Sequence, residues 1–232
     1  MKLIYVTNTR LPSEQAHSYQ TIKMCEALAA NGIEVVLCYP NRRQSLALMN
    51  KDLFKYYGVK PIFNVQIIGQ FGIISSYKII YLIQNLIWSS LAYFKMRKLK
   101  PDYFYTRDII IVFWFSLLGL PTIYEEHLIQ KSRLARTAMR IMAKKESLKL
   151  VIVLTNSIKK DLIALGFSDK RVLVLPDAAD LGLFENLPEK NACRKKLNLP
   201  QEKIIIGYIG RFRVFGHQEK GLPQLIEAVA KL

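Results

Sequence analysis

The sequence has little cysteine, and the cysteines that it has are not paired. Cys25, Cys38 and Cys193 are far apart and form no Cys-x-x-Cys motif. This spacing argues against a disulfide framework and against a zinc site. Cys25 and Cys38 lie in apolar segments, so we expect both to be buried as small hydrophobic side chains, in keeping with a reducing cytoplasm.

Long apolar runs and familiar phosphate-binding signatures are also missing. The two longest apolar stretches, Ile79 to Phe94 and Ile109 to Leu120, are interrupted by polar residues or too short to cross a bilayer. The apolar start of the chain is too short for a signal peptide. No Walker A loop occurs, and Gly207 and Gly210 lack the third glycine of a dinucleotide fingerprint. The sequence therefore argues against transmembrane, P-loop and NAD-dependent proteins.

Acidic residues are scarce relative to basic ones. The 232 residues include 34 Lys and Arg but only 18 Asp and Glu, for a net charge of +16. This excess favours anionic partners such as nucleotide phosphates or a membrane face. Eleven of the bases lie between Lys131 and Arg171, which predicts either a solvated helix face or a surface that meets acidic lipid headgroups. Specific nucleic-acid binding is disfavoured, because no helix-turn-helix, RNA-recognition or zinc signature is present.

The chain instead alternates short β-branched runs with segments of helical apolar spacing. Strands are predicted at residues 2–7, 33–39, 65–68, 103–106, 122–125, 151–154 and 172–175, and helices at 19–30, 77–97, 109–118, 130–148 and 157–165. The first helix is expected to end at Asn31-Gly32, where glycine tolerates a left-handed conformation. This alternation predicts an α/β fold with a doubly wound, Rossmann-like parallel sheet.

A second, incomplete domain is predicted after the sheet. We assign residues 1–180 to an N-terminal domain, the polar segment 181–200 to a linker, and residues 201–232 to the start of a second Rossmann-like domain. That start consists of a buried-type strand, Lys203 to Tyr208, and an amphipathic helix, Leu222 to Leu232. Because one strand and one helix cannot bury their own apolar faces, we expect this domain to be truncated.

Ligands of open α/β sheets bind beyond the carboxyl ends of the strands, which selects a few polar loops here. His127 follows a strand in Tyr124-Glu125-Glu126-His127. It is able either to hydrogen-bond a phosphate or sugar hydroxyl or to cap the next helix. Arg211 and Lys220 flank the loop after the last predicted strand. They form either a diphosphate site or a solvated basic loop.

Several motifs together resemble the GT-B glycosyltransferases of glycosyltransferase family four, the group 1 transferases. They occur in the family's order along nearly the whole chain. The motifs are Leu11-Pro12-Ser13 with Ala16-His17-Ser18, residues 27–35, Tyr105-Thr106-Arg107-Asp108, Tyr124-Glu125-Glu126-His127, residues 153–157, residues 174–180, and Ile206-Gly207-Tyr208-Ile209-Gly210-Arg211 with Lys220-Gly221-Leu222.

The resemblance implies a retaining, hexosyl-type glycosyltransferase that needs no metal or other cofactor. The first domain is expected to bind the acceptor and the second the nucleotide-sugar donor. The implied site residues are His127 as the catalytic residue facing the sugar, Arg211 and Lys220 at the donor diphosphate, Ser13, His17 and Ser18 in the acceptor and phosphate loop, and Arg107, Asp108, Glu126 and Asn156 in the cleft.

The sequence departs from the family pattern in two places. The Glu-x7-Glu segment of the donor domain is absent from these 232 residues, and the first loop lacks the family's paired glycines. The isolated chain is therefore expected to be inactive unless a separate chain supplies the missing half. The partners implied are a nucleotide-sugar donor, a glycan or lipid-linked acceptor of polysaccharide biosynthesis, and the anionic inner face of the membrane. The alternative is a non-catalytic module that docks on a membrane surface or a partner chain through its basic Lys131 to Arg171 surface.

Overall fold

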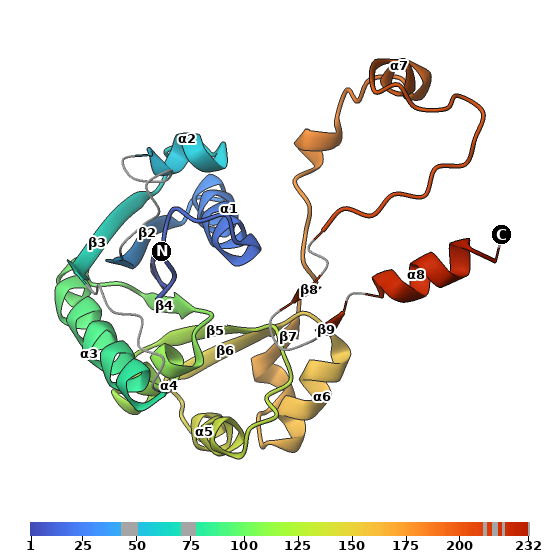
Figure 1. The fold of residues 1–232 in the computed structure, drawn as a ribbon. Coiled ribbons are helices and arrows are strands. Elements are labelled where there is room, and N and C mark those ends of the chain that lie inside the picture. Colours follow the sequence, from blue (N-terminus) through green and yellow to red (C-terminus); the bar gives the residue numbers. More distant parts are fainter. Residues whose placement is uncertain (43–50, 71–77, 211–212, 215–217, 220, 232) are drawn as a thin grey trace. The chain divides into compact units, whose positions relative to one another are not determined.

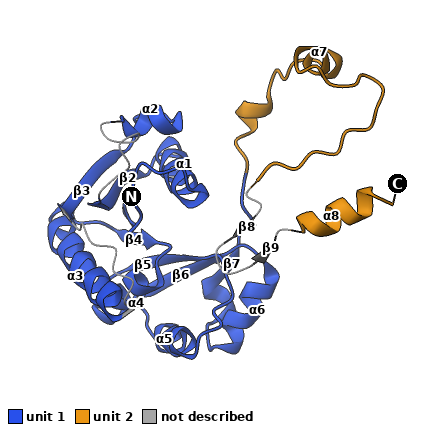
Figure 2. Ribbon diagram, in the orientation of Figure 1, with its two compact units in different colours: residues 1–178 blue, residues 179–232 orange. Residues whose placement is uncertain are grey.

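The computed structural model describes residues 1–42, 51–70, 78–210, 213–214, 218–219 and 221–231 (Figure 1). These residues form two compact units, Met1–Ala178 and Ala179–Leu232 (Figure 2). The first unit carries the sheet and most of the predicted site residues.

The first unit is built on a seven-stranded sheet in which every neighbouring pair is parallel. Its strands are β1 (Lys2–Val6), β2 (Glu34–Asn41), β3 (Asn64–Gln70), β4 (Tyr103–Thr106), β5 (Thr122–Glu126), β6 (Leu148–Val153) and β7 (Val172–Val174). They lie in the order β3-β2-β1-β4-β5-β6-β7. The chain thus runs outward from β1 in both directions, which confirms the predicted doubly wound α/β fold.

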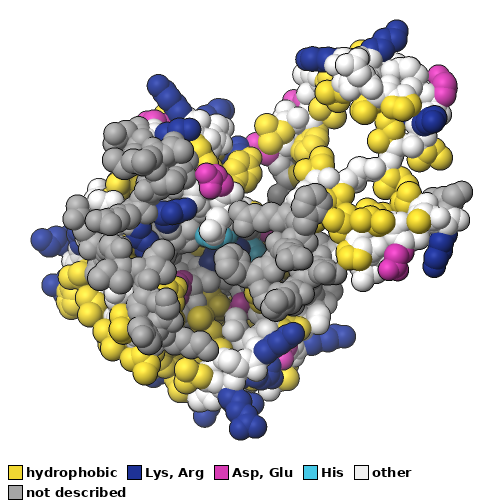
Figure 3. Space-filling model, viewed as in Figure 1, with side chains coloured by type: hydrophobic (Ala, Val, Ile, Leu, Met, Phe, Trp, Pro, Cys, Tyr) yellow, Lys and Arg dark blue, Asp and Glu magenta, His cyan; other side chains and the backbone are white. Residues whose placement is uncertain are grey.

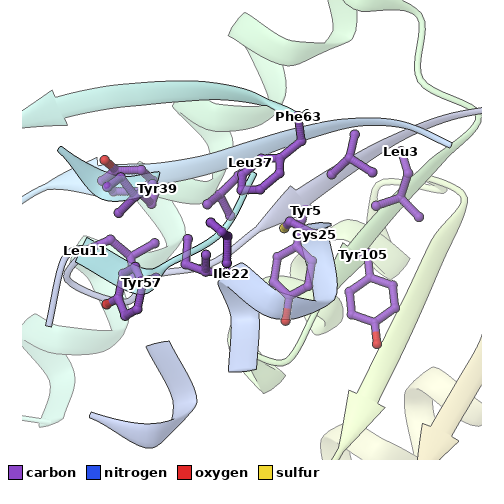
Figure 4. Close-up of a cluster of buried hydrophobic side chains, with 13 residues drawn as sticks. Leu3, Tyr5, Leu11, Ile22, Cys25, Leu37, Tyr39, Tyr57, Phe63 and Tyr105 are labelled. Atoms are coloured by element: carbon purple, nitrogen blue, oxygen red, sulfur yellow. The ribbon is translucent and has the colours of Figure 1, made fainter. Parts of the chain in front are cut away.

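Helices cover both faces of this sheet (Figure 1). On one face lie α1 (Ala16–Ala30) and the short α2 (Leu53–Tyr57), and on the other lie α3 (Lys78–Met96), α4 (Ile109–Leu117), α5 (Arg133–Ala143) and α6 (Asn156–Ala164). The α1 face packs a cluster that includes Tyr5, Ile22 and Cys25 (Figure 4). Cys25 and Cys38 are both fully buried, as predicted. The rings of Tyr5 and Tyr105 lie 4.8 Å apart and their hydroxyls point the same way.

Local signals explain where these helices begin and end. The side chains of Ser132, Asp108 and Thr155 accept hydrogen bonds from backbone N–H groups in the first turns of α5, α4 and α6, each a stabilising cap of about 1 kcal/mol. Gly32 follows α1 with φ of 81°, the left-handed conformation expected there.

The predicted basic helix at residues 130–148 is too long. Helix α5 ends at Ala143, and Leu148 already begins β6 opposite Thr122. Apolar spacing alone does not separate the last turn of a helix from the strand that follows it. The structure also contains α2, whose five residues are too few to show helical periodicity.

The second unit contains a 3-10 helix (η4, Leu181–Phe184), α7 (Lys190–Lys196), an antiparallel pair of β8 (Arg213–Val214) and β9 (Gln218–Glu219), and α8 (Leu222–Val229). The predicted final helix is present, but the strand predicted at Lys203 to Tyr208 is wrong. Those residues are irregular, and Ile204 is 93% exposed. An apolar run forms a buried strand only where a neighbouring strand pairs with it, and no described strand pairs with these residues. None of this unit's described side chains is buried.

Within the described part of the chain, no helix has the length and apolar character needed to span a bilayer.

Candidate functional site

The carboxyl ends of β1, β4 and β5 lie next to one another at one edge of the sheet. The parallel register places Tyr5 beside Tyr105, and Thr106 beside Tyr124. The residues that follow β4 and β5 are Arg107 and His127, so this register brings two predicted site residues together.

Arg107 and His127 belong to a hydrogen-bonded group that we call the Glu125 cluster: Gln20, Tyr105, Arg107, Glu125 and His127. Glu125 is 3% exposed and accepts hydrogen bonds from the Tyr105 hydroxyl and the His127 ring. The Arg107 Nε lies 3.8 Å from the same carboxylate. Arg107 also donates from one terminal nitrogen to Nδ1 of His127 at 2.9 Å and from the other to Oε1 of Gln20 at 2.9 Å.

The contacts of His127 fix its tautomer. A guanidinium only donates hydrogen bonds, so Nδ1 of His127 must accept from Arg107. The proton therefore sits on Nε2, which donates it to Glu125. His127 is thus held between a cation and a carboxylate, and its side chain keeps 19% of its surface exposed.

The cluster stabilises the charged form of Glu125. Burial by itself would raise the pKa of this carboxyl. The hydrogen bonds from His127 and Tyr105 and the charge of Arg107 outweigh burial and lower the pKa below its ordinary value. The Glu125 carboxylate is therefore a buried counter-charge for Arg107. The Arg107 side chain itself stays partly exposed, with 17% of its surface accessible.

Gln20 connects the cluster to the end of β7. Its amide nitrogen donates to Asp177 at 2.6 Å while its oxygen accepts from Arg107. Neither Gln20 nor Glu125 was among the predicted site residues. Both carried a usable signal. Gln20 lies near the start of α1, the helix that follows the carboxyl end of β1. Residues 125 and 127 share one face because side chains alternate along a strand.

The same alternation places the Glu126 side chain on the opposite face of β5 from Glu125. Its carboxylate accepts hydrogen bonds from the Tyr124 hydroxyl at 2.8 Å, from the Leu128 N–H at 3.3 Å and from the Gln130 amide. Burial raises the pKa of Glu126 despite these neutral donors. Glu126 holds the segment after β5 in place, and its role in a cleft stays a prediction.

Two further predicted cleft residues lie at helix starts. Asp108 caps α4 by accepting from the N–H groups of Ile110 and Ile111 at 2.8 and 3.3 Å, and burial raises its pKa. Asn156 is exposed as the first residue of α6. Asp108 thereby fixes the direction in which the chain leaves Arg107.

The predicted acceptor loop is held by its two serines. The hydroxyls of Ser13 and Ser18 lie 2.6 Å apart, and both residues are buried. The Tyr57 hydroxyl accepts from the N–H of Ser13 and donates to its carbonyl, both at 2.8 Å. His17 is exposed beside them, and loss of hydration together with the charge of Arg107 lowers its pKa. His17 is therefore the member of this loop that faces solvent near the cluster.

Arg211 and Lys220 lie outside the described residues. Among the residues that the structure describes, no group of three or more His, Cys, Asp or Glu side chains is placed to hold a metal ion. The expectation that no metal or other cofactor takes part stays a prediction.

The doubly wound sheet, with its polar cluster at the carboxyl edge, has the architecture of a GT-B glycosyltransferase N-terminal domain. The family model for Glycosyltransferase Family 4 matches residues 18–183, which is most of the chain. The chain therefore belongs to Glycosyltransferase Family 4. No curated protein matches this sequence.

Solved structures share this fold at low sequence identity. Sucrose-phosphate synthase from Thermosynechococcus elongatus matches with a TM-score of 0.72 and 17% identity, over 100% of this chain and 60% of that protein. HepE from Anabaena in complex with UDP matches with a TM-score of 0.64 and 15% identity, over 100% of this chain and 58% of that protein. This chain thus spans less than two thirds of the length of either protein.

Proposed function

We propose that this chain is the acceptor-side part, with the beginning of the donor-side part, of a retaining, hexosyl-type glycosyltransferase. It uses a nucleotide-sugar donor and a glycan or lipid-linked acceptor of polysaccharide biosynthesis, in the cytoplasm at the inner face of the membrane. The observation that supports this most is the Glu125 cluster, which sits at the carboxyl edge of the sheet in a chain of this family.

The cluster suits a sugar or phosphate ligand. The described contacts of Arg107 occupy one N–H on each terminal nitrogen, which leaves a second N–H on each. Two such donors match the geometry of a phosphate or carboxylate. His127 lies against this cation, and since Arg107 and Glu125 engage both of its ring nitrogens, it would hold Arg107 in place beside a bound sugar. His17 approaches from the first loop.

The donor side of the proposal rests on the resemblance and on the fold relatives. HepE has been solved with UDP and with UDP-glucose. Arg211 and Lys220 are our proposed donor diphosphate ligands. The described residues of the second unit bury no side chain, so we propose that the 232-residue chain turns over no donor on its own.

Donor hydrolysis by the protein isolated from its own cells, at the length that it has there, tests this function. UDP-glucose binding by calorimetry and acceptor-independent release of UDP should both be measurable. His127→Ala should slow UDP release by about 100-fold, because Arg107 and Glu125 lose the ring that orients them. Lys160→Ala, at an exposed base of α6, is the matched control and should behave as wild type. An isolated protein that is longer than 232 residues and neither binds nor hydrolyses a panel of nucleotide sugars would overturn the proposal, as would donor turnover by the 232-residue chain alone.

A non-catalytic module that docks on a membrane is the second candidate. The outward face of α3 favours it, as described next.

A further inference from the structure

Helix α3 exposes its large apolar side chains and buries polar ones. Asn85 and Ser89 are 1% and 0% exposed. A helix that faces water has the reverse arrangement. Exposed apolar residues that recur every three or four positions form one stripe, which we call the α3 stripe: Ile79 (72% exposed), Ile83 (49%), Ile87 (51%), Leu91 (47%) and Phe94 (54%). Ile80, Tyr81 and Leu82 widen the exposed apolar surface in the first turns of the helix.

The α3 stripe cannot turn inward, because the opposite side of the helix is fixed in the core. Trp88, Ala92 and Met96 are buried against β1 and β4. The indole N–H of Trp88 donates to the carbonyl of Ile68 in β3 at 3.0 Å. The α3 stripe can therefore be covered only by something other than the first unit's own core.

Basic residues follow the stripe at the carboxyl end of α3. Lys95, Arg97, Lys98 and Lys100 are exposed, and residues 78–100 contain no Asp or Glu. The Arg97 guanidinium lies 5.1 Å from the centre of the Phe94 ring. One end of an otherwise apolar strip is thus positively charged.

The neighbouring helices extend this surface. Helix α4 packs between α3 and α5 on the same face of the sheet, and Leu117 and Leu118 at its end are 41% and 44% exposed. On α5, Arg133, Arg140 and Lys144 are exposed and recur at helical spacing. Figure 3 shows apolar side chains gathered over α3 and basic ones over α5. Part of the basic Lys131 to Arg171 surface therefore continues the α3 surface. Arg136 and Lys159 are instead paired with Asp161 and Asp169.

We propose that the α3–α4–α5 surface docks on an anionic lipid bilayer. The α3 stripe inserts at the level of the headgroups and upper acyl chains, and the bases of α5 and of the end of α3 contact lipid phosphates. An apolar strip bordered by bases and free of acids complements a surface that is apolar inside and anionic at its rim. This inference deepens the membrane-docking candidate and does not require donor binding.

Vesicle flotation of the whole 232-residue chain, without any nucleotide sugar, tests this surface. The chain should float with vesicles of phosphatidylglycerol and phosphatidylcholine. It should bind phosphatidylcholine alone more weakly, and salt should weaken the anionic binding. Ile83→Gln, Ile87→Gln and Leu91→Gln combined should reduce partitioning at least about tenfold, because three apolar side chains no longer insert. The matched control combines Leu181→Gln, Leu183→Gln and Leu187→Gln, at positions 73%, 62% and 65% exposed, and should bind as wild type.

Circular dichroism establishes that both triple variants are folded. Wild-type protein that fails to float with anionic vesicles, or an α3 variant that floats as well as wild type, overturns the proposal. Light scattering tests whether a second copy of the chain covers the α3 stripe instead of a membrane. If the wild type is a dimer and only the α3 variant is a monomer, the stripe is a subunit interface and the membrane proposal is wrong. A negative donor-binding result leaves the vesicle result intact, so the two proposals fail separately.

Discussion

Glu125 and Glu126 are neighbours in the chain, yet β5 directs them to opposite faces of the sheet, and their pKa values shift in opposite directions. Each is buried and each accepts a hydrogen bond from a tyrosine, Tyr105 or Tyr124. Only Glu125 has a cation and a histidine beside it. The pKa of Glu125 is lowered, whereas that of Glu126 is raised.

The comparison separates two uses of a buried carboxylate. Neutral donors alone do not offset the loss of hydration at Glu126, so that residue serves as an anchor for the loop after β5. At Glu125 the hydrogen bonds from His127 and Tyr105, together with the charge of Arg107, outweigh burial and lower the pKa. The cluster around Glu125 thus makes one face of β5 a polar site, whereas the other face carries a structural contact.

Removing the cation should have the largest effect on this comparison. Arg107→Ala leaves the buried Glu125 carboxylate without its counter-charge, and we expect the free energy of unfolding to fall by about 3 kcal/mol at neutral pH. Urea denaturation measures the loss. Arg107→Lys keeps a charge but not the planar fork, so it should recover part of the stability. Equal stabilities of the Ala variant and wild type would show that the cation does not stabilise Glu125.

Neutralising Glu125 should have the next largest effect. Glu125→Gln leaves Arg107 without its carboxylate, and we expect a loss of about 2 kcal/mol at pH 7. The folded-state pKa of Glu125 lies below its ordinary value of 4.5. Its contribution is therefore present above that value and is lost as pH falls through the folded pKa. The stability gap between variant and wild type should close in acid, and a gap independent of pH would contradict the assignment.

Neutralising Glu126 should have the smallest effect and the opposite pH dependence. Glu126→Gln should stay within about 1 kcal/mol of wild type. Because the folded-state pKa is raised above 4.5, the stability that Glu126 contributes is present below that value and is lost as pH rises through the folded pKa. The variant should therefore gain on wild type between acid and neutral pH. Urea denaturation midpoints measured across this pH range show whether the variant gains or loses stability relative to wild type. If Glu126→Gln followed the same pH trend as Glu125→Gln, the two carboxylates would not differ in the direction of their pKa shifts.

Much of the fold was predictable from two sequence patterns. Parallel strands buried on both faces appear as continuous apolar runs, and the helices between them show apolar residues every three or four positions. The strand predicted at 203–208 on the same basis was wrong. Ile204 and its neighbours have the composition of a buried strand, but burial depends on neighbouring strands that a local pattern does not contain. Helix α2 was missed because a single turn shows no period.

Much of the candidate site followed from one rule, that polar residues after parallel strands meet at one edge. This rule selected Arg107 and His127, which are in contact. It did not say which of the two glutamates accompanies them, since that depends on the phase of β5. Gln20 was missed because its contact with Arg107 joins positions 87 residues apart. The roles predicted for Ser13, Ser18, Arg211 and Lys220 stay predictions.

The two-way hydrogen bond between Tyr57 and Ser13 has a consequence for how the protein matures on the ribosome. One hydroxyl satisfies both backbone groups of a residue 44 positions earlier. The growing chain therefore cannot complete the loop after β1 until Tyr57 has emerged and α2 has docked beside α1. The first loop of the candidate site is among the first segments to be synthesised and is finished only after two strands and two helices have assembled around it.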